Sequence, residues 1–123
     1  SGADAVKFQT FKAEKFINPL EKKRYQKLKK FELSFEQFEK LSLIAKKNKL
    51  KFISTPFDLD SAKFLSKIVD VFKIASGDND YFNLIDKVIN YNKPVLISLG
   101  LSNNKSVKKL YTHIKRIKKI YQT

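Results

Sequence analysis

The chain has 123 residues, of which 42% are hydrophobic and 13% aromatic, and this size and composition are typical of one globular domain rather than a disordered segment. It contains no cysteine, methionine or tryptophan, so disulfides, thiolate metal sites and cysteine nucleophiles are excluded. The formal net charge of +14 admits an acidic partner, but the lysines are spread over all the expected helices, which also fits ordinary solvated surfaces.

The N-terminal part of the chain predicts one strand and a long connection. Residues 3–10 form an apolar run in which Lys7 and Gln9 are two positions apart, so they lie on the same face of a strand. Residues 11–33 are charged and irregular and contain Pro19. We expect either a plain solvent loop there or a connection that includes a helical turn.

The next segment predicts a helix with a buried aromatic stripe. Ser34 followed by Gln37 is a capping-box pattern, and helical periodicity then continues to Asn48. The apolar positions at this spacing are Phe35, Phe38, Leu41, Ile44 and Ala45.

A second strand and helix come directly after it. Residues 51–54 predict a short strand that ends at Thr55-Pro56. Asp58 or Asp60 can cap the helix behind it, because a carboxylate there accepts from the free backbone N–H groups of the first turn. The inner face of that helix comprises Ala62, Leu65 and Ile68.

The same unit then repeats twice. Residues 69–75 predict a strand, 76–80 a turn, 81–91 a helix, 95–99 another strand and 103–121 a strongly amphipathic helix. The inward positions are Leu84, Ile85, Val88 and Ile89 in the first of these helices, and Val107, Leu110, Tyr111, Ile114, Ile117 and Ile120 in the second.

Strict alternation of apolar strands and helices predicts an α/β fold with parallel strands covered by helices. An open doubly wound sheet and a (β/α)8 barrel both fit. No Gly-x-Gly-x-x-Gly follows the first strand, and polar residues stand at the C-terminal end of every strand, where barrel enzymes carry their chemistry. A whole barrel needs roughly 200 residues or more, so we expect a partial TIM barrel of about four β/α units.

Polar groups at the strand ends suggest an anion site. The donors expected to ring the mouth of the sheet are Lys7, Gln9, Thr55, Lys73, Ser76 and Ser98. Ammonium and hydroxyl groups together suit a small molecule that carries both a phosphate and a carboxylate. Each lysine can instead be an ordinary strand-end residue that extends to solvent, and Asp78 can be a catalytic carboxylate or a turn or capping residue. We interpret His113 as a surface histidine and not as a metal ligand.

Four ordered segments resemble a known family. The segments are GADAVKFQTFKAEK (2–15), FISTPFD (52–58), FKIASGD (72–78) and KPVLISLG (93–100). Together they closely resemble the sialic acid synthase family, which comprises N-acetylneuraminate synthase and the related legionaminic and pseudaminic acid synthases. The resemblance extends over essentially all of the chain.

The resemblance implies a transferase that acts in carbohydrate biosynthesis for cell-surface polysaccharides. Separately, the sequence has no apolar stretch of roughly 18 residues and no N-terminal signal pattern, from which we expect a soluble cytoplasmic protein. Members of this family condense phosphoenolpyruvate with an open-chain N-acylated amino sugar resembling N-acetylmannosamine, forming a C–C bond, a nonulosonic acid and free phosphate. A divalent metal, Mn²⁺ or Mg²⁺, polarises the sugar aldehyde and positions water. The expected assembly is a homodimer that binds neither nucleic acid nor membrane.

The resemblance also assigns site residues. Lys7, Gln9 and Thr55 match positions around the phosphoenolpyruvate carboxylate, and Lys73, Ser76 and Ser98 match positions around its phosphate. Lys73 and Asp78 are the expected catalytic residues, although the family usually has glutamate where Asp78 stands. The usual Ser-Thr-Gly-Met reads Ser98-Leu99-Gly100-Leu101, which retains only the first hydroxyl.

The resemblance further implies that residues 1–123 are one part of the catalytic barrel. The family's first strand, its later strands with two metal-binding histidines, and its C-terminal antifreeze-like domain have no counterpart here. His113 matches neither histidine, so we expect the metal ligands outside this chain and no activity from the chain alone.

Two other functions fit the residues. Lys73 or Lys7 could form a Schiff base in an aldolase or lyase of the TIM-barrel class, since burial lowers the pKa of an amine and makes it nucleophilic. Alternatively, the basic helix 103–121 could make the chain a non-catalytic binding module for nucleic acid or anionic lipid.

Overall fold

The computed structural model of the chain describes residues 2–121, and the side chains of residues 2–117. The strands β1 (Ala5–Thr10), β2 (Lys51–Pro56), β3 (Val71–Ile74) and β4 (Val95–Ile97) form one parallel sheet in the order β1-β2-β3-β4. The main helices are α3 (Phe35–Lys47), α4 (Leu59–Leu65), α5 (Phe82–Ile89) and α6 (Asn104–Tyr121). The predicted alternation of parallel strands and helices is therefore confirmed. β3 and β4 are shorter than predicted, whereas β2 extends two residues further.

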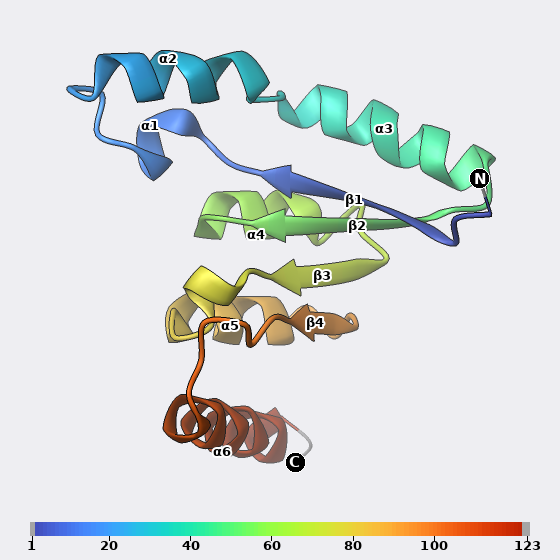
Figure 1. The fold of residues 1–123 in the computed structure, drawn as a ribbon. Coiled ribbons are helices and arrows are strands. Elements are labelled where there is room, and N and C mark those ends of the chain that lie inside the picture. Colours follow the sequence, from blue (N-terminus) through green and yellow to red (C-terminus); the bar gives the residue numbers. More distant parts are fainter. Residues whose placement is uncertain (1, 122–123) are drawn as a thin grey trace.

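The two faces of the sheet have opposite character. Figure 1 shows the strands side by side, all pointing the same way, with α4 and α5 behind them. On the helix-covered face, Phe52, Phe72 and Ile74 are buried in one core with helical side chains such as Leu84. Alternation along β1 places Lys7 and Gln9 on the other face, where both are exposed. Helices therefore cover only one face of the described sheet.

The N-termini of two helices confirm and refine the capping predictions. The Ser34 hydroxyl accepts from the Gln37 backbone N–H at 3.2 Å, and the Gln37 side chain accepts from the Ser34 N–H at 2.8 Å. At α4 the cap is Asp58, whose carboxylate accepts from Ser61 N at 2.8 Å. Asp60 instead pairs with Lys15, so only one of the two candidate aspartates caps this helix.

The connection between β1 and α3 is more helical than predicted. It contains α1 (Ala13–Phe16) and the three-turn helix α2 (Lys22–Phe31). No side chain of α2 is buried, and only Tyr25, Leu28 and Phe31 among its ten residues are apolar, so its helical spacing gave only a weak signal. The segment is nevertheless rich in lysine, which favours helix, and Glu32 at its end accepts from Ala13 N at 2.9 Å.

Two side chains predicted to be inward lie outside the core. Ile44 is 57% exposed and Tyr111 is 60% exposed. Successive helical residues are about 100° apart, so each points away from its buried neighbour, Ala45 or Leu110. The Lys115 ammonium covers the Tyr111 ring at 4.7 Å from its centroid. The predicted inward position Ile120 lies outside the described side chains.

No helix within residues 2–121 has the length and apolar character needed to cross a lipid bilayer.

Substituting Phe72, the fully buried side chain at the middle of β3, should strongly destabilise the fold. Phe72→Ala removes a ring from the core and leaves a cavity, so we expect the free energy of unfolding to fall by about 3–5 kcal/mol in urea titrations. Phe31 is 66% exposed, and Phe31→Ala is the matched control, with an expected change within about 0.5 kcal/mol. Equal losses in the two variants would contradict the described core.

Candidate active site

The predicted donors gather at one edge of the sheet because the strands are parallel. Gln9 pairs with Thr55 in the register of β1 and β2, and Lys73 pairs with Leu96 in the register of β3 and β4. Ser98 follows the last residue of β4, and its N–H donates to Ile74 O at 3.1 Å. The carboxyl ends of all four strands thus contribute to a single edge.

Lys73 has the most defined environment in this set. Its ammonium donates to Ser98 Oγ at 2.6 Å and to Ile74 O at 2.5 Å, which joins the ends of β3 and β4. An ammonium has three N–H donors, so these two contacts leave one for a ligand. Two of the six predicted residues, Lys73 and Ser98, are therefore in direct contact.

Lys7 and Lys73 form a pair of like charges. Burial lowers the pKa of Lys73 below its ordinary value, and the positive charge of Lys7 lowers it further. Neither ammonium has a carboxylate partner among the side chains that the structure describes. Two neighbouring cations without a counterion favour an anionic ligand between them, because its charge would relieve their repulsion.

The other predicted donors are less closely connected. Thr55 is buried next to Gln9, whereas Ser76 begins η1 (Ser76–Asp78), a short 3₁₀ turn directly after β3. No hydrogen bond joins Gln9, Thr55 or Ser76 to Lys73 in the described part of the chain. The division of these residues between a carboxylate and a phosphate group stays a prediction.

Asp78 does not serve as a helix cap. The N-cap of α5 is Tyr81, which makes no side-chain capping bond, and Asp78 contributes only its carbonyl to Tyr81 N at 3.0 Å. Burial raises the pKa of the Asp78 carboxyl above its ordinary value, and the nearby charge of Asp80 adds to this effect. A half-buried carboxylate that caps nothing is available for a ligand.

Asn79 is a site-edge residue that the sequence did not single out. Its amide nitrogen donates to Ser102 Oγ at 2.6 Å and to Ser98 O at 3.3 Å. It thus ties the turn after β3 to the loop after β4, next to the Lys73–Ser98 contact. The local signal was only an asparagine in a turn, and nothing in its spacing indicated a partner 23 residues away.

His113 is more involved in packing than a free surface histidine. Its Nε2 lies 2.6 Å from Asp86 Oδ1, and its ring lies against Phe82 at a centroid distance of 4.4 Å. Both partners belong to α5, on the outer side of the sheet. Among the described residues, no group of three histidine, aspartate or glutamate side chains could hold a metal ion.

Comparison with known proteins identifies the family. The sequence model of the NeuB family matches residues 1–121. The chain belongs to the NeuB family. This agrees with the resemblance seen in the four sequence segments.

Relatives of this NeuB-family chain include named synthases. It is 45% identical over 103 residues to an uncharacterized protein of Methanocaldococcus jannaschii, covering 83% of this chain and 30% of that protein. It is 37% identical over 117 residues to the N,N'-diacetyllegionaminic acid synthase of Campylobacter jejuni, covering 84% of this chain and 35% of that protein. The chain therefore spans about a third of the length of these relatives.

A solved structure confirms the predicted fold class. The N-acetylneuraminic acid synthetase of Leptospira borgpetersenii, crystallised in complex with citrate, matches with a TM-score of 0.87 at 26% identity. The match covers 94% of this NeuB-family chain and 41% of the synthetase. The chain is thus part of a (β/α)8 TIM barrel, and its open sheet face corresponds to the inside of that barrel.

Removing the charge of Lys7 should raise the pKa of Lys73. In Lys7→Gln the repulsive neighbour is gone and only burial still lowers the pKa, so the titration should move toward the ordinary lysine value. NMR titration of the Lys73 side chain measures the shift. Lys51 lies at the opposite end of β2, and Lys51→Gln is the control that should leave the Lys73 pKa in place. An unchanged pKa in Lys7→Gln would contradict the proximity of the two lysines.

Proposed function

We propose that this chain supplies the phosphoenolpyruvate-binding part of a nonulosonic acid synthase. The reaction joins phosphoenolpyruvate to an N-acylated amino sugar resembling N-acetylmannosamine and releases phosphate. Membership of the NeuB family and the named legionaminic acid synthase among its relatives support this activity. Within the chain, the observation that carries the proposal is the pair of ammonium groups, Lys7 and Lys73, without a carboxylate partner in the described residues.

Phosphoenolpyruvate suits this edge because it carries two anionic groups a few bonds apart. Lys73, with Ser98 already hydrogen-bonded to it at 2.6 Å, would hold the phosphate together with Ser76. Lys7, Gln9 and Thr55 would hold the carboxylate from the neighbouring strands. Charge-assisted contacts at both ends orient the molecule, so its methylene carbon presents one face to the sugar.

In the proposed reaction the methylene carbon of phosphoenolpyruvate forms a bond to the aldehyde carbon of the sugar, and the aldehyde oxygen takes up a proton. The enol carbon becomes electron-deficient and adds water, after which the phosphate leaves with its bridging oxygen. Lys73 stabilises the phosphate as charge develops on it. Asp78 lies at the same edge, and its carboxylate would hold a sugar hydroxyl or the added water by accepting a hydrogen bond from it.

The divalent metal of this family has no ligand set in the described residues, which hold no cluster of suitable side chains. Residues outside this chain would hold it, and it would supply polarisation of the sugar aldehyde. We also propose three properties of the natural-length protein. It would supply the metal ligands, lie in the cytoplasm and assemble as a homodimer.

One observation favours a second candidate, a Schiff-base aldolase. The lowered pKa of Lys73 is the property that makes an amine nucleophilic. Reduction with borohydride in the presence of pyruvate would trap a covalent adduct on Lys73 if this reaction occurs. The synthase reaction forms no such adduct, so mass spectrometry of the treated protein separates the two functions.

Loss of Lys73 should impair phosphoenolpyruvate binding. In the natural-length protein, Lys73→Ala removes a charge-assisted hydrogen bond worth about 1.5–3 kcal/mol, so we expect KM for phosphoenolpyruvate to rise roughly 10- to 100-fold. Phosphate release with Mn²⁺ and N-acetylmannosamine or its bacterial relatives is the assay. Lys63→Ala in α4 is the control with the same charge change. A normal KM in Lys73→Ala would refute the assignment, and turnover by residues 1–123 alone would contradict the expected dependence on the rest of the barrel.

The carboxylate of Asp78 should set an acidic limb in the pH profile of kcat. If the ionised form is needed, kcat falls as pH falls through the pKa of Asp78, which burial and Asp80 raise above its ordinary value. Asp80→Asn removes the repulsive charge, so the limb should move to lower pH. Asp78→Asn should lower kcat and remove the limb. A limb that persists unchanged in Asp78→Asn would assign it to another group.

A further inference from the structure

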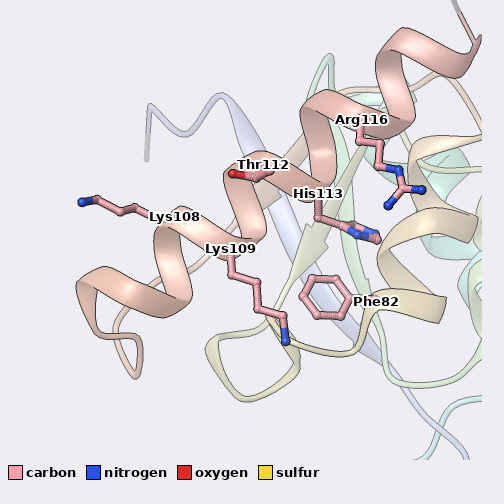
Figure 2. Close-up of a pocket in the computed structure, with 6 residues that line it drawn as sticks. All are labelled: Phe82, Lys108, Lys109, Thr112, His113 and Arg116. Carbon is pink, nitrogen blue, oxygen red and sulfur yellow. The ribbon is translucent and has the colours of Figure 1, made fainter.

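A second basic site lies on the outer side of the barrel, away from the strand ends. Helices α5 and α6 form a surface cavity of about 480 Å³, shown in Figure 2. Its lining residues are Phe82, Lys108, Lys109, Thr112, His113 and Arg116. None of these described lining residues is acidic. The volume falls within the range of small-molecule sites, which is roughly 300–1,000 Å³.

The floor of the cavity is held in place by contacts between the two helices. The His113 ring packs on Phe82 at 4.4 Å between centroids, and its Nε2 is 2.6 Å from Asp86 Oδ1. The Lys109 ammonium lies 5.1 Å from the centroid of the Phe82 ring. Figure 2 shows Lys109, His113 and Arg116 on the side of α6 that faces α5, whereas Lys108 extends away from Phe82.

The cations of this cavity are not neutralised by the protein. The nearby carboxylate of Asp86 lies 2.6 Å from His113 Nε2 and is within ion-pair distance of neither Lys109 nor Arg116. Lys109 and Arg116 have no carboxylate partner among the described side chains. A guanidinium fork and an ammonium are groups that bind phosphate oxygens effectively.

We propose that the cavity between α5 and α6 binds the phosphate group of a small phosphorylated metabolite, with Lys109 and Arg116 as the main ligands. The organic part of the ligand would lie against Phe82, which offers an apolar surface beside the two charges. The limited volume and the confinement of the lining residues to two helices favour a small molecule over a nucleic-acid strand, which needs a row of cations along a longer groove. This site is separate from the proposed phosphoenolpyruvate site and does not depend on it.

The test uses the natural-length protein with phosphoenolpyruvate at saturating concentration, so that the strand-end site is occupied. Inorganic pyrophosphate is titrated at constant pH and low salt while NMR follows the His113 ring resonances, identified by their loss in His113→Gln. We expect a saturable shift. In the double variant Lys109→Ala/Arg116→Ala the dissociation constant should rise at least about tenfold, because the loss of even one contact to a charged group has an effect of about that size.

The matched control is the double variant Lys115→Ala/Arg24→Ala, which loses the same two positive charges. Lys115 lies over Tyr111 on α6, and Arg24 lies near Glu21 by α2, so neither lines the cavity. This control should bind pyrophosphate nearly as tightly as the unmodified protein. KM for phosphoenolpyruvate should stay normal in both double variants, so a failure of this proposal is distinguishable from a failure of the proposed function.

Three results would overturn the proposal. A shift of the His113 resonances that never saturates would mean that pyrophosphate has no defined site there. Equal weakening in the two double variants would assign binding to the overall net charge. Tighter binding of a single-stranded oligonucleotide than of pyrophosphate, lost in Lys109→Ala/Arg116→Ala, would make the surface a nucleic-acid site instead.

Discussion

Each of the four strands pairs in parallel with its neighbour in chain order, so a helix must return the chain to the same end before every new strand. This connection rule determines most of the architecture. It places all strand C-termini at one edge, and it places the apolar sides of the helices against one face of the sheet. The buried rings of Phe52 and Phe72 stabilise that face, while Lys7 and Gln9 remain on the open one.

The site then depends on electrostatics at that edge. Lys73 is held by two oxygen acceptors and is repelled by Lys7, so it is positioned without being neutralised. Such an arrangement costs stability in the free protein, because burial and like charge both disfavour the ammonium form. A dianionic ligand compensates this cost on binding. The outer cavity has a similar arrangement, because Lys109 and Arg116 form no ion pair among the described side chains.

Sequence patterns predicted the elements that bury an apolar face and missed the one that does not. The capping box at Ser34 and the alternation of strands and helices were correct because local chemistry specifies them. Helix α2 was missed because only three of its ten residues are apolar and none of its side chains is buried, so its periodic signal is weak. Tyr111 was placed inward because it borders the apolar stripe, although a rotation of about 100° per residue separates it from Leu110.

The sequence by itself determined the alternation of the four strands with the helices that pack on them, the parallel sheet, the family and the set of polar residues at the strand ends. These depend on periodicity, turn residues and motif spacing, which are local properties of the chain. Only the tertiary structure decided which polar groups meet. The Lys73–Ser98 contact joins residues 25 positions apart, and Asn79 reaches Ser102 across two loops. Such pairs depend on strand register and loop packing, which bring distant residues to within 3 Å without leaving any pattern in the sequence.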